Sequence, residues 1–499
     1  MVFSSLEFIY LFLPPVFLGF MILRALRLET AIIFWLIGAS LTFYAWWSPP
    51  HLLLILGSVT FNYAVHLALQ RQPAKALFVF GVIVNLALLA TFKYADFLIG
   101  NFNAVSGQDI GALGLVLPLA ISFYTFQQIS FLHDSWKGSL VATDFKRYLL
   151  FVTFFPQLIA GPIVMQRDTL PQFTLQRFLS RPALNFALGA TLFSIGLFKK
   201  IVLADGVAPY ANTVFTMADQ GQLVGFGDAW FGSIAYTFQI YFDFSGYCDM
   251  ALGLALLFGI RLPINFNSPY KALNIVDFWR RWHITLSNFL RDYLYIPLGG
   301  NRSGWCGTRG NLMITMLLGG LWHGAGWNFV IWGGLHGGFL MINHVWSGST
   351  QRSMAVQLLP SWIYAMVAWT ITMLCVVVAW VFFRAETLDG ALLVLHGMAS
   401  LPQIGQMPTV LPGQALDLIA QFVALFGIVL LLPNSVEFTR GYRPVLHAFS
   451  KTVRHGGLFA SMRWAPTPAW GAAIMVVASA GIIQIYRLNG LTEFIYFNF

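Results

Sequence analysis

The chain has 499 residues, of which 58% are hydrophobic, 16% aromatic and only 9% charged, and its mean hydropathy is +0.71. Soluble domains carry roughly 25% charged residues, so this composition excludes an ordinary water-soluble protein and predicts a polytopic membrane protein. The net charge of +9 does not indicate nucleic-acid binding, because the basic residues lie between apolar runs, as the positive-inside rule predicts.

The cysteines and the N-terminus narrow the class further. No metal or redox spacing connects the cysteines Cys248, Cys306 and Cys375, so we expect neither a structural disulfide nor a metal site. The N-terminus lacks the basic region of a signal peptide, because Glu7 precedes the first apolar stretch while Arg24 and Arg27 follow it. We therefore expect a retained first span with its N-terminus outside the cytoplasm.

Long apolar runs recur along the whole chain. A spanning helix needs about 20 mostly apolar residues, and about eleven runs qualify. They cover residues 5–23, 31–47, 51–70, 76–99, 113–132, 183–208, 229–260, 311–345, 361–383, 415–433 and 466–487. The count stays open between residues 311 and 433, because 311–345 is too long for one span and 384–414 can cross or loop. The sequence predicts an all-α polytopic protein with a single membrane domain over residues 1–499.

The apolar segment 148–165 differs from the spans. Pro156, Gly161 and Pro162 interrupt it, and basic residues flank it on both sides. Non-helical backbone occurs at membrane depth only where it is covered by protein or lines a cavity. We expect a re-entrant segment that enters and leaves from the cytoplasmic face.

Residues 261–310 form the most basic stretch of the chain. The stretch contains seven basic residues but only two acidic ones, Asp277 and Asp292. Aromatic residues such as Trp279, Trp282 and Tyr293 lie between the basic ones in the sequence. This pattern is typical of an amphipathic segment that lies along the cytoplasmic interface of a membrane.

A polar cluster interrupts the apolar run 229–260. It consists of Tyr241, Asp243, Ser245 and Asp249, and we group Trp322 of a later apolar run with it. Ionisable groups at membrane depth cost at least ~2.5 kcal/mol each, so they need partners or a function. Two interpretations remain open: the cluster fixes helix packing, or it lines a reaction tunnel.

A histidine among glycines is the strongest catalytic candidate. His323 lies between Trp322 and Gly324, and an imidazole with an ordinary pKa near ~6.5 acts as a general base at neutral pH. A packing role is the alternative, and we expect packing roles for His336 and His344. His283, in the basic segment, is a second candidate. The sequence has no G-x-S-x-G, H-E-x-x-H or G-x-x-x-x-G-K-[S/T] motif, so the residues alone indicate a membrane enzyme or a transporter.

Four stretches together resemble a known family. FFPQLIAGPI at 154–163, YFDFSGYCDMALG at 241–253, DFWRRWHITLSNFLRDYLYIPLGGNR at 277–302 and LLGGLWHGAGWNFVIWGGLHG at 317–337 are similar to the membrane-bound O-acyltransferase (MBOAT) family. Within it they most resemble the bacterial branch that acetylates exopolysaccharides such as alginate. The resemblance implies a ring of tilted helices around a central tunnel, with His323 as the catalytic histidine and His283 as the second histidine.

The same resemblance implies an activity. We expect an inner-membrane O-acetyltransferase that takes acetyl from a cytoplasmic thioester, acetyl-coenzyme A or another, and holds no bound cofactor. Alginate is the favoured acceptor; cellulose, peptidoglycan and D-alanyl transfer to teichoic acid are alternatives, as is a non-enzymatic transporter or export scaffold. Expected partners are the lipid bilayer and periplasmic polysaccharide-acetylation proteins. Four arginines either attract the donor phosphates or anchor the topology: Arg280, Arg281, Arg291 and Arg302.

The C-terminal tail, residues 489–499, is unusually aromatic. Basic residues before the last span predict a cytoplasmic loop, so the tail is expected on the periplasmic side. One interpretation is an aromatic anchor at the bilayer interface. The other is that the tail folds back into the tunnel, where Tyr496 faces His323 as a transient acetyl carrier, since a phenol of pKa near ~10 is activated by a base.

Overall fold

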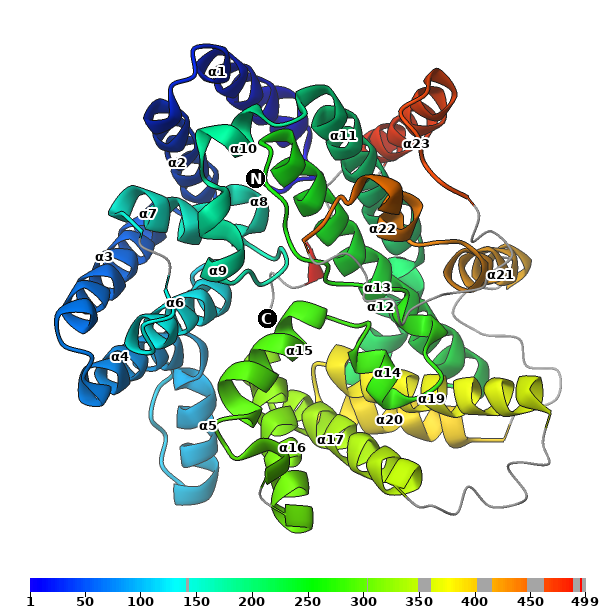
Figure 1. Ribbon diagram of the computed structural model, residues 1–499. Coiled ribbons are helices and arrows are strands. Elements are labelled where there is room, and N and C mark those ends of the chain that lie inside the picture. Colours follow the sequence, from blue (N-terminus) through cyan, green and yellow to red (C-terminus); the bar gives the residue numbers. More distant parts are fainter. Residues whose placement is uncertain are drawn as a thin grey trace.

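The computed structural model describes residues 1–140, 143–302, 304–348, 360–401, 415–446, 462–487 and 494–495. Within these ranges the regular structure is helical, apart from one isolated β-bridge between Pro263 and Leu446. Most of the longer helices form a ring, and short helices together with part of α13 lie inside it (Figure 1). The all-α prediction is therefore confirmed.

The helices of the ring have the following bounds. In the first half these are π-helical turn η1 (Glu7–Phe12), α1 (Leu13–Ala25), α2 (Glu29–Ala45), α3 (Pro49–Arg71), α4 (Lys75–Lys93), α5 (Ala95–Ser106) and α6 (Ile121–Trp136). The second half contains α11 (Pro182–Phe198), π-helical turn η3 (Lys199–Ala204), α12 (Asp205–Asp219), α13 (Phe226–Leu257), α16 (Gly304–His323), α17 (Trp327–Gly348), α19 (Ser361–Arg384), α20 (Leu388–Ala399), α21 (Ala415–Leu431) and α23 (Pro468–Arg487).

Short helices connect these elements. They are α7 (Phe145–Thr153), α8 (Phe155–Leu158), α9 (Gln166–Thr169), η2 (Leu170–Gln172), α10 (Leu175–Leu179), η4 (Pro269–Lys271), α14 (Ile275–Trp279), α15 (Ile284–Leu290), η5 (Arg291–Tyr295), η6 (Gly300–Arg302), α22 (Ser435–Phe438) and η7 (Arg440–Tyr442).

The predicted total of about eleven spans is not confirmed. In the described part of the chain, seven helices are long and apolar enough to cross a membrane: Glu7–Ala25, Pro49–Arg71, Lys75–Lys93, Pro182–Asp219, Phe226–Leu257, Ser361–Arg384 and Pro468–Arg487. Three expected runs are divided or shortened. The run 76–99 divides after Lys93 into α4 and α5, and 311–345 divides at residues 324–326 into α16 and α17. The run 113–132 becomes helical only at Ile121, after Pro118 and a left-handed Ala120 with φ +63°.

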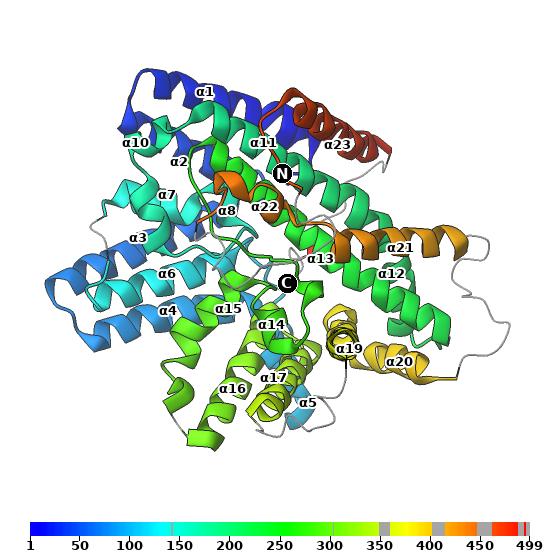
Figure 2. The ribbon, with the colours of Figure 1, turned by 45° about the vertical axis from the view of Figure 1, so that its right-hand side comes forward.

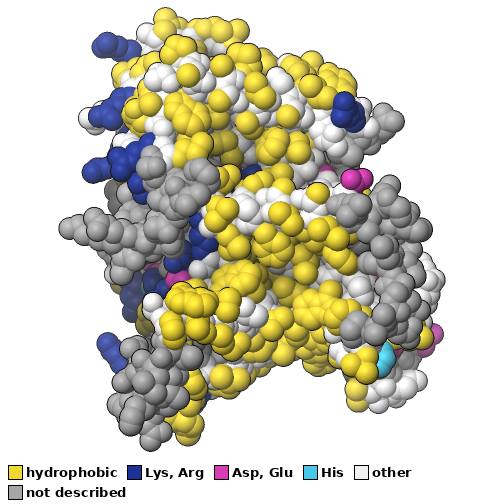
Figure 3. All heavy atoms as spheres, turned by 90° about the vertical axis from the view of Figure 1, so that its right-hand side faces the viewer, with side chains coloured by type: hydrophobic (Ala, Val, Ile, Leu, Met, Phe, Trp, Pro, Cys, Tyr) yellow, Lys and Arg dark blue, Asp and Glu magenta, His cyan; other side chains and the backbone are white. Residues whose placement is uncertain are grey.

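The exterior carries the pattern expected of a membrane protein. Hydrophobic side chains cover the middle of the face in Figure 3, while lysines and arginines gather along one edge, which we call the basic edge. Many large apolar side chains are exposed, including Leu53, Val105, Met475 and Val476. An apolar surface with lysines and arginines along one border matches a protein that spans a bilayer. Helices α21 and α23 lie at the outside of the ring (Figure 2).

The central helix α13 packs against α11 at two pairs of glycines. A Cβ on Gly196 would lie 2.5 Å from the carbonyl oxygen of Gly246, and a Cβ on Gly253 would lie 2.5 Å from that of Gly189. Glycine alone allows such close approach of two helix backbones, as in other membrane helix pairs. The pairing fixes α11 and its continuation, η3, directly against α13.

Two non-spanning segments fill the centre. Residues 148–165 form α7, α8 and irregular backbone that is buried, and side chains satisfy part of this backbone: Ser40 Oγ accepts from the Phe155 N–H (3.1 Å) and Thr285 Oγ1 from the Ile163 N–H (3.0 Å). The membrane re-entry of this segment stays a prediction.

The basic stretch 261–310 lies along a surface only in its later part. Phe278 and Trp282 are buried, and the exposed residues gather from Arg291 onward. The reason is aromatic packing, because the Trp282 ring lies 4.9 Å from Trp380 of α19 and 5.7 Å from Phe278, centroid to centroid.

Candidate active site

Two buried histidines meet in the centre of the ring. His323 is the last residue of α16, and His283 directly precedes α15. Their side chains are 2% and 0% exposed, and their ring centroids lie 6.3 Å apart. The sequence predicted each histidine separately, and the structure brings them together.

The position of His283 is fixed by its backbone and by one polar network. Its φ of +44° lies in the left-handed region. This conformation is unfavourable for a non-glycine residue and persists only because the surrounding structure stabilises it. Asn265 Oδ1 lies 3.1 Å from His283 Nδ1 and accepts a hydrogen bond from Thr285 Oγ1 (2.8 Å). Burial lowers the pKa of His283 to about 3, so the imidazole is neutral at physiological pH.

An aromatic cage surrounds His323. Its ring centroid lies 4.9 Å from Trp322, 5.0 Å from Trp332 and 5.1 Å from Phe383. Trp322 stacks in turn on Phe126 of α6, at 5.1 Å and an interplanar angle of 14°. The cage holds the imidazole in one orientation and excludes water from its sides.

The turn after His323 depends on glycine. A Cβ on Gly324 would lie 2.0 Å from the ring of Phe329, and a Cβ on Gly320 would lie 2.2 Å from the Phe329 carbonyl oxygen. Glycines therefore let α17 fold back against α16 immediately after the catalytic candidate.

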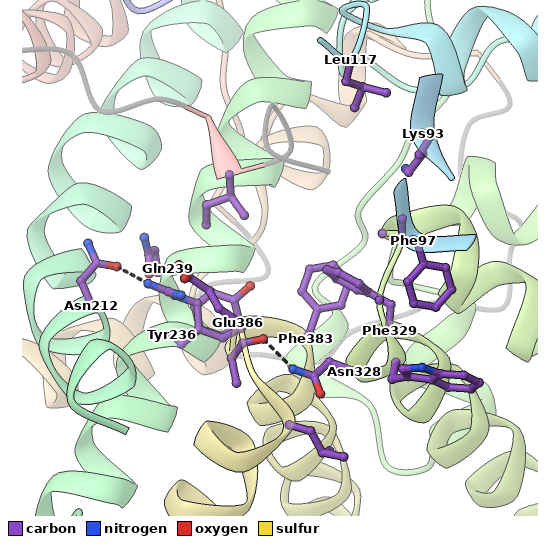
Figure 4. Close-up of a pocket in the computed structure, with 18 of the residues that line it drawn as sticks. Lys93, Phe97, Leu117, Asn212, Tyr236, Gln239, Asn328, Phe329, Phe383 and Glu386 are labelled. Carbon is purple, nitrogen blue, oxygen red and sulfur yellow. Dashed lines mark hydrogen bonds between the residues drawn. The ribbon is translucent and has the colours of Figure 1, made fainter. Parts of the chain in front are cut away.

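A cavity of about 1060 Å³ reaches this turn. Figure 4 shows Asn212, Tyr236 and Gln239 on one side and Asn328, Phe329 and Phe383 on the other. Gly324 and Phe383, both next to His323, belong to its lining, as do Lys93, Lys200 and Asp205. The cavity is large enough for a small-molecule or sugar-sized ligand.

The polar cluster predicted on α13 divides into two ion-paired groups. Asp243 pairs with Lys200 (2.5 Å), which also pairs with Asp205 (2.9 Å). Asp249 pairs with Lys199 (2.7 Å) and accepts a hydrogen bond from Ser435 (2.7 Å). Sequence reasoning missed both lysines, although charged residues inside the apolar run 183–208 were the signal that could have found them.

The other predicted members of this cluster are buried packing residues. Tyr241 lies 5.1 Å from Tyr270, ring to ring, and Ser245 is 2% exposed. Trp322 belongs to the cage of His323 instead.

The four arginines do not form one group. Arg281 is 7% exposed; its Nε lies 2.8 Å from Asp277 Oδ2 and its Nη1 donates to the Asn267 carbonyl. Its charge is thus already neutralised inside the fold, which does not suit the predicted attraction of donor phosphates. Arg280, Arg291 and Arg302 are exposed.

Part of the C-terminal tail returns to the centre. Phe494 is 2% exposed, and its ring stacks on that of Tyr247 of α13, with 4.6 Å between the centroids. The Phe494 ring also lies 5.8 Å from the ring of Phe244 of α13. Phe244 in turn contacts His283, with 4.8 Å between the ring centroids. Ile495 lines the cavity. Tyr496 lies outside the described residues.

Comparisons with known proteins identify the fold and the chemistry. The model of the MBOAT, membrane-bound O-acyltransferase family matches residues 140–381, which include both histidines. A Helicobacter pylori protein named peptidoglycan O-acetyltransferase is 46% identical over 431 residues, 80% of each chain. The chain belongs to the membrane-bound O-acyltransferase family. It is therefore an acyltransferase with the MBOAT fold, which excludes the alternative of a non-enzymatic transporter.

Two Pseudomonas relatives are also similar, one of them over the whole chain. Proteins named probable alginate O-acetylase AlgI are 38% identical over 509 residues in Pseudomonas putida, 100% of both chains, and 43% identical over 410 residues in Pseudomonas aeruginosa, 80% of this chain and 75% of the relative. This MBOAT chain thus has a relative of matching full length that is named for alginate O-acetylation.

Proposed function

We propose that this acyltransferase takes acetyl from a cytoplasmic thioester and delivers it to an exopolysaccharide on the other side of the inner membrane. The observation that carries the proposal is the pair of buried histidines, 6.3 Å apart between ring centroids, beside the large cavity. The names of the relatives support acetyl as the transferred group.

His323 acts as the general base in this proposal. It removes the proton from the attacking hydroxyl, whose oxygen forms a bond to the acetyl carbon while the carbon–sulfur bond breaks. The thiolate that leaves takes this proton from the imidazolium and departs as the thiol. General-base assistance contributes roughly 10²–10⁴-fold, and alignment of two substrates in a confined site contributes more. His283, neutral and fixed by Asn265, orients the donor or the base.

The basic edge is the cytoplasmic side in this proposal, because cytoplasmic loops of membrane proteins are rich in lysine and arginine. We also propose that both termini are periplasmic, because basic residues follow the first apolar run and precede the last one. The exposed Arg280, Arg291 and Arg302 attract the phosphates of acetyl-coenzyme A, the donor we propose. Periplasmic polysaccharide-acetylation proteins receive the acetyl group.

Alginate is the acceptor we favour, since the full-length relative is named for it. Peptidoglycan is the second candidate, supported by the Helicobacter relative. We further propose Tyr496 as the acetyl carrier, because its neighbours Phe494 and Ile495 lie in the centre of the fold. Tyr496→Phe tests this role, since it deletes only the hydroxyl; acetylation at the wild-type level would leave the aromatic-anchor interpretation standing.

The decisive experiment compares two histidine variants. His323→Ala should abolish acetylation of secreted polymer, while His344→Ala, at an exposed position on α17, should retain it. Equal membrane levels of both proteins are the control. Chemical analysis of the acetylated polymer identifies the acceptor, and a polymer acetylated normally by His323→Ala would overturn the general-base role.

A further inference from the structure

The end of α16 is capped by side chains from another helix. A helix leaves its last four carbonyl groups without intrahelical partners. Three of these in α16 accept hydrogen bonds from two adjacent residues: Tyr94 Oη donates to the Leu321 carbonyl (2.9 Å), and Lys93 Nζ to those of Trp322 (2.5 Å) and His323 (3.2 Å). Lys93 ends α4, and Tyr94 precedes α5.

The other side of the same turn is attached to α5. Trp327, the first residue of α17, donates from its indole nitrogen to Asn101 Oδ1 (2.9 Å), and its ring lies edge-on to Phe97 at 5.9 Å. Residues 93–101, which we call the α4–α5 corner, therefore hold the turn Leu321–Trp327 at both ends. His323 lies inside this turn.

The chemistry of Lys93 suits a cap. A cation is favourable at the negative end of a helix dipole, and Lys93 Nζ also lies 5.8 Å from the centroid of the Trp322 ring, within cation–π range. Lys93 lines the large cavity as well, so direct binding of a substrate is the competing role that a test must separate.

We propose that Lys93, assisted by Tyr94, is a positioning residue for His323. The proposal rests on the proposed function, in which His323 is the base. Because a displacement of about 1 Å can cost roughly 10²-fold in rate, loss of the cap should lower kcat without weakening binding of the acetyl donor.

The experiment uses the full-length protein in proteoliposomes with labelled acetyl-coenzyme A on the side of the basic edge. The periplasmic acetylation proteins and a polysaccharide acceptor are supplied on the other side. Lys93→Met should lower kcat by roughly 10–100-fold with KM for acetyl-coenzyme A unchanged within about twofold. Lys93→Arg, which keeps the charge and several donors, should restore most of the activity. Tyr94→Phe, which removes only one hydroxyl, should give a smaller loss. Lys75→Met, at the exposed opposite end of the same helix, is the matched control and should resemble wild type.

Hydrogen–deuterium exchange supplies a readout that is independent of activity. Peptides covering residues 317–330 should exchange faster in Lys93→Met than in Lys75→Met, because the turn opens more often. Unchanged exchange, or a raised KM with kcat intact, would overturn the positioning role. Faster exchange with unchanged kcat would also overturn the positioning role, because the cap would then hold the turn without any effect on the reaction. A fully active His323→Ala variant in the same assay would instead overturn the proposed function on which this inference rests. If Lys93→Met fails to fold, Tyr94→Phe decides by the same two measurements.

Discussion

The backbone N–H of Ile495 donates a hydrogen bond of 3.1 Å to Oδ2 of Asp243, across 252 positions of sequence. The acceptor is a carboxylate that Lys200 also holds. This contact attaches the C-terminal part of the chain to the central helix α13.

The contact predicts the effect of proline at position 495. Ile495→Pro removes the backbone donor, and the membrane-embedded part should stay folded. Polymer acetylation should fall at least about tenfold, because the alignment of groups at the site is lost. Ile495→Val keeps the donor and should resemble wild type. Acetyl content of the polymer and limited proteolysis at the C-terminus are the measurements. Full acetylation by the proline variant would show that the attachment has no role in the reaction.

The two histidines should differ in the severity of their loss. His283→Ala should retain roughly 1–10% of wild-type acetylation, because it removes an orienting group, whereas His323→Ala removes the base and should retain none. The measurement is the acetyl content of the polymer, normalised to the amount of folded protein. Equally complete losses would mean that the two imidazoles act as one unit.

Two glycines of the turn after His323 offer a matched pair of variants. Gly324→Ala places a Cβ 2.0 Å from the Phe329 ring, whereas a Cβ on Gly326 meets that ring at an ordinary 3.7 Å. Gly324→Ala should therefore destabilise the turn by about 1–3 kcal/mol, the usual cost of overpacking, and inactivate the enzyme, while Gly326→Ala should be tolerated. Thermal unfolding in detergent and acetylation assays compare the two. Similar behaviour of both variants would contradict the close contact at Gly324.

The buried ion pairs of Lys200 with Asp205 and Asp243 predict an order of stability among three variants. Lys200→Met leaves Asp205 and Asp243 facing each other without their shared cation, and breaking a buried pair typically costs about 3–5 kcal/mol. Asp243→Asn leaves the Lys200–Asp205 pair intact and should cost less. The double variant Lys200→Met/Asp243→Asn should be more stable than Lys200→Met alone. Unfolding temperatures in detergent give the order, and a reversed order would mean that Lys200 is not the shared partner.

Much of the fold could be predicted from the sequence because apolar runs report directly on helices in a membrane. The histidines were predicted because they interrupt such runs in recognisable motifs. The division of 311–345 is an intermediate case: its excess length indicated a break, and the glycines around His323 mark its position.

The contacts that arrange the site could not be predicted. Lys93 is the last residue of an ordinary apolar helix, and nothing near it in the sequence indicates that it caps carbonyls more than two hundred positions away. Lys200 and Asp243 likewise become partners only because α11 and α13 pack closely. Pairing of buried polar groups is decided by tertiary packing, which local patterns do not record.

The glycine pairs between α11 and α13 also restrict how the enzyme moves. Sliding one helix past the other by a single turn, about 5.4 Å, would bring side chains to positions where only glycine fits between the two backbones. Lys199 and Lys200 of η3, which follows α11 directly, pair with Asp249 and Asp243 of α13. The same slide would therefore separate both ion pairs. This wall of the cavity therefore behaves as a rigid frame. We therefore expect movement that admits or releases a substrate in other parts of the lining, such as the side formed by Lys93, Phe97 and the turn after His323.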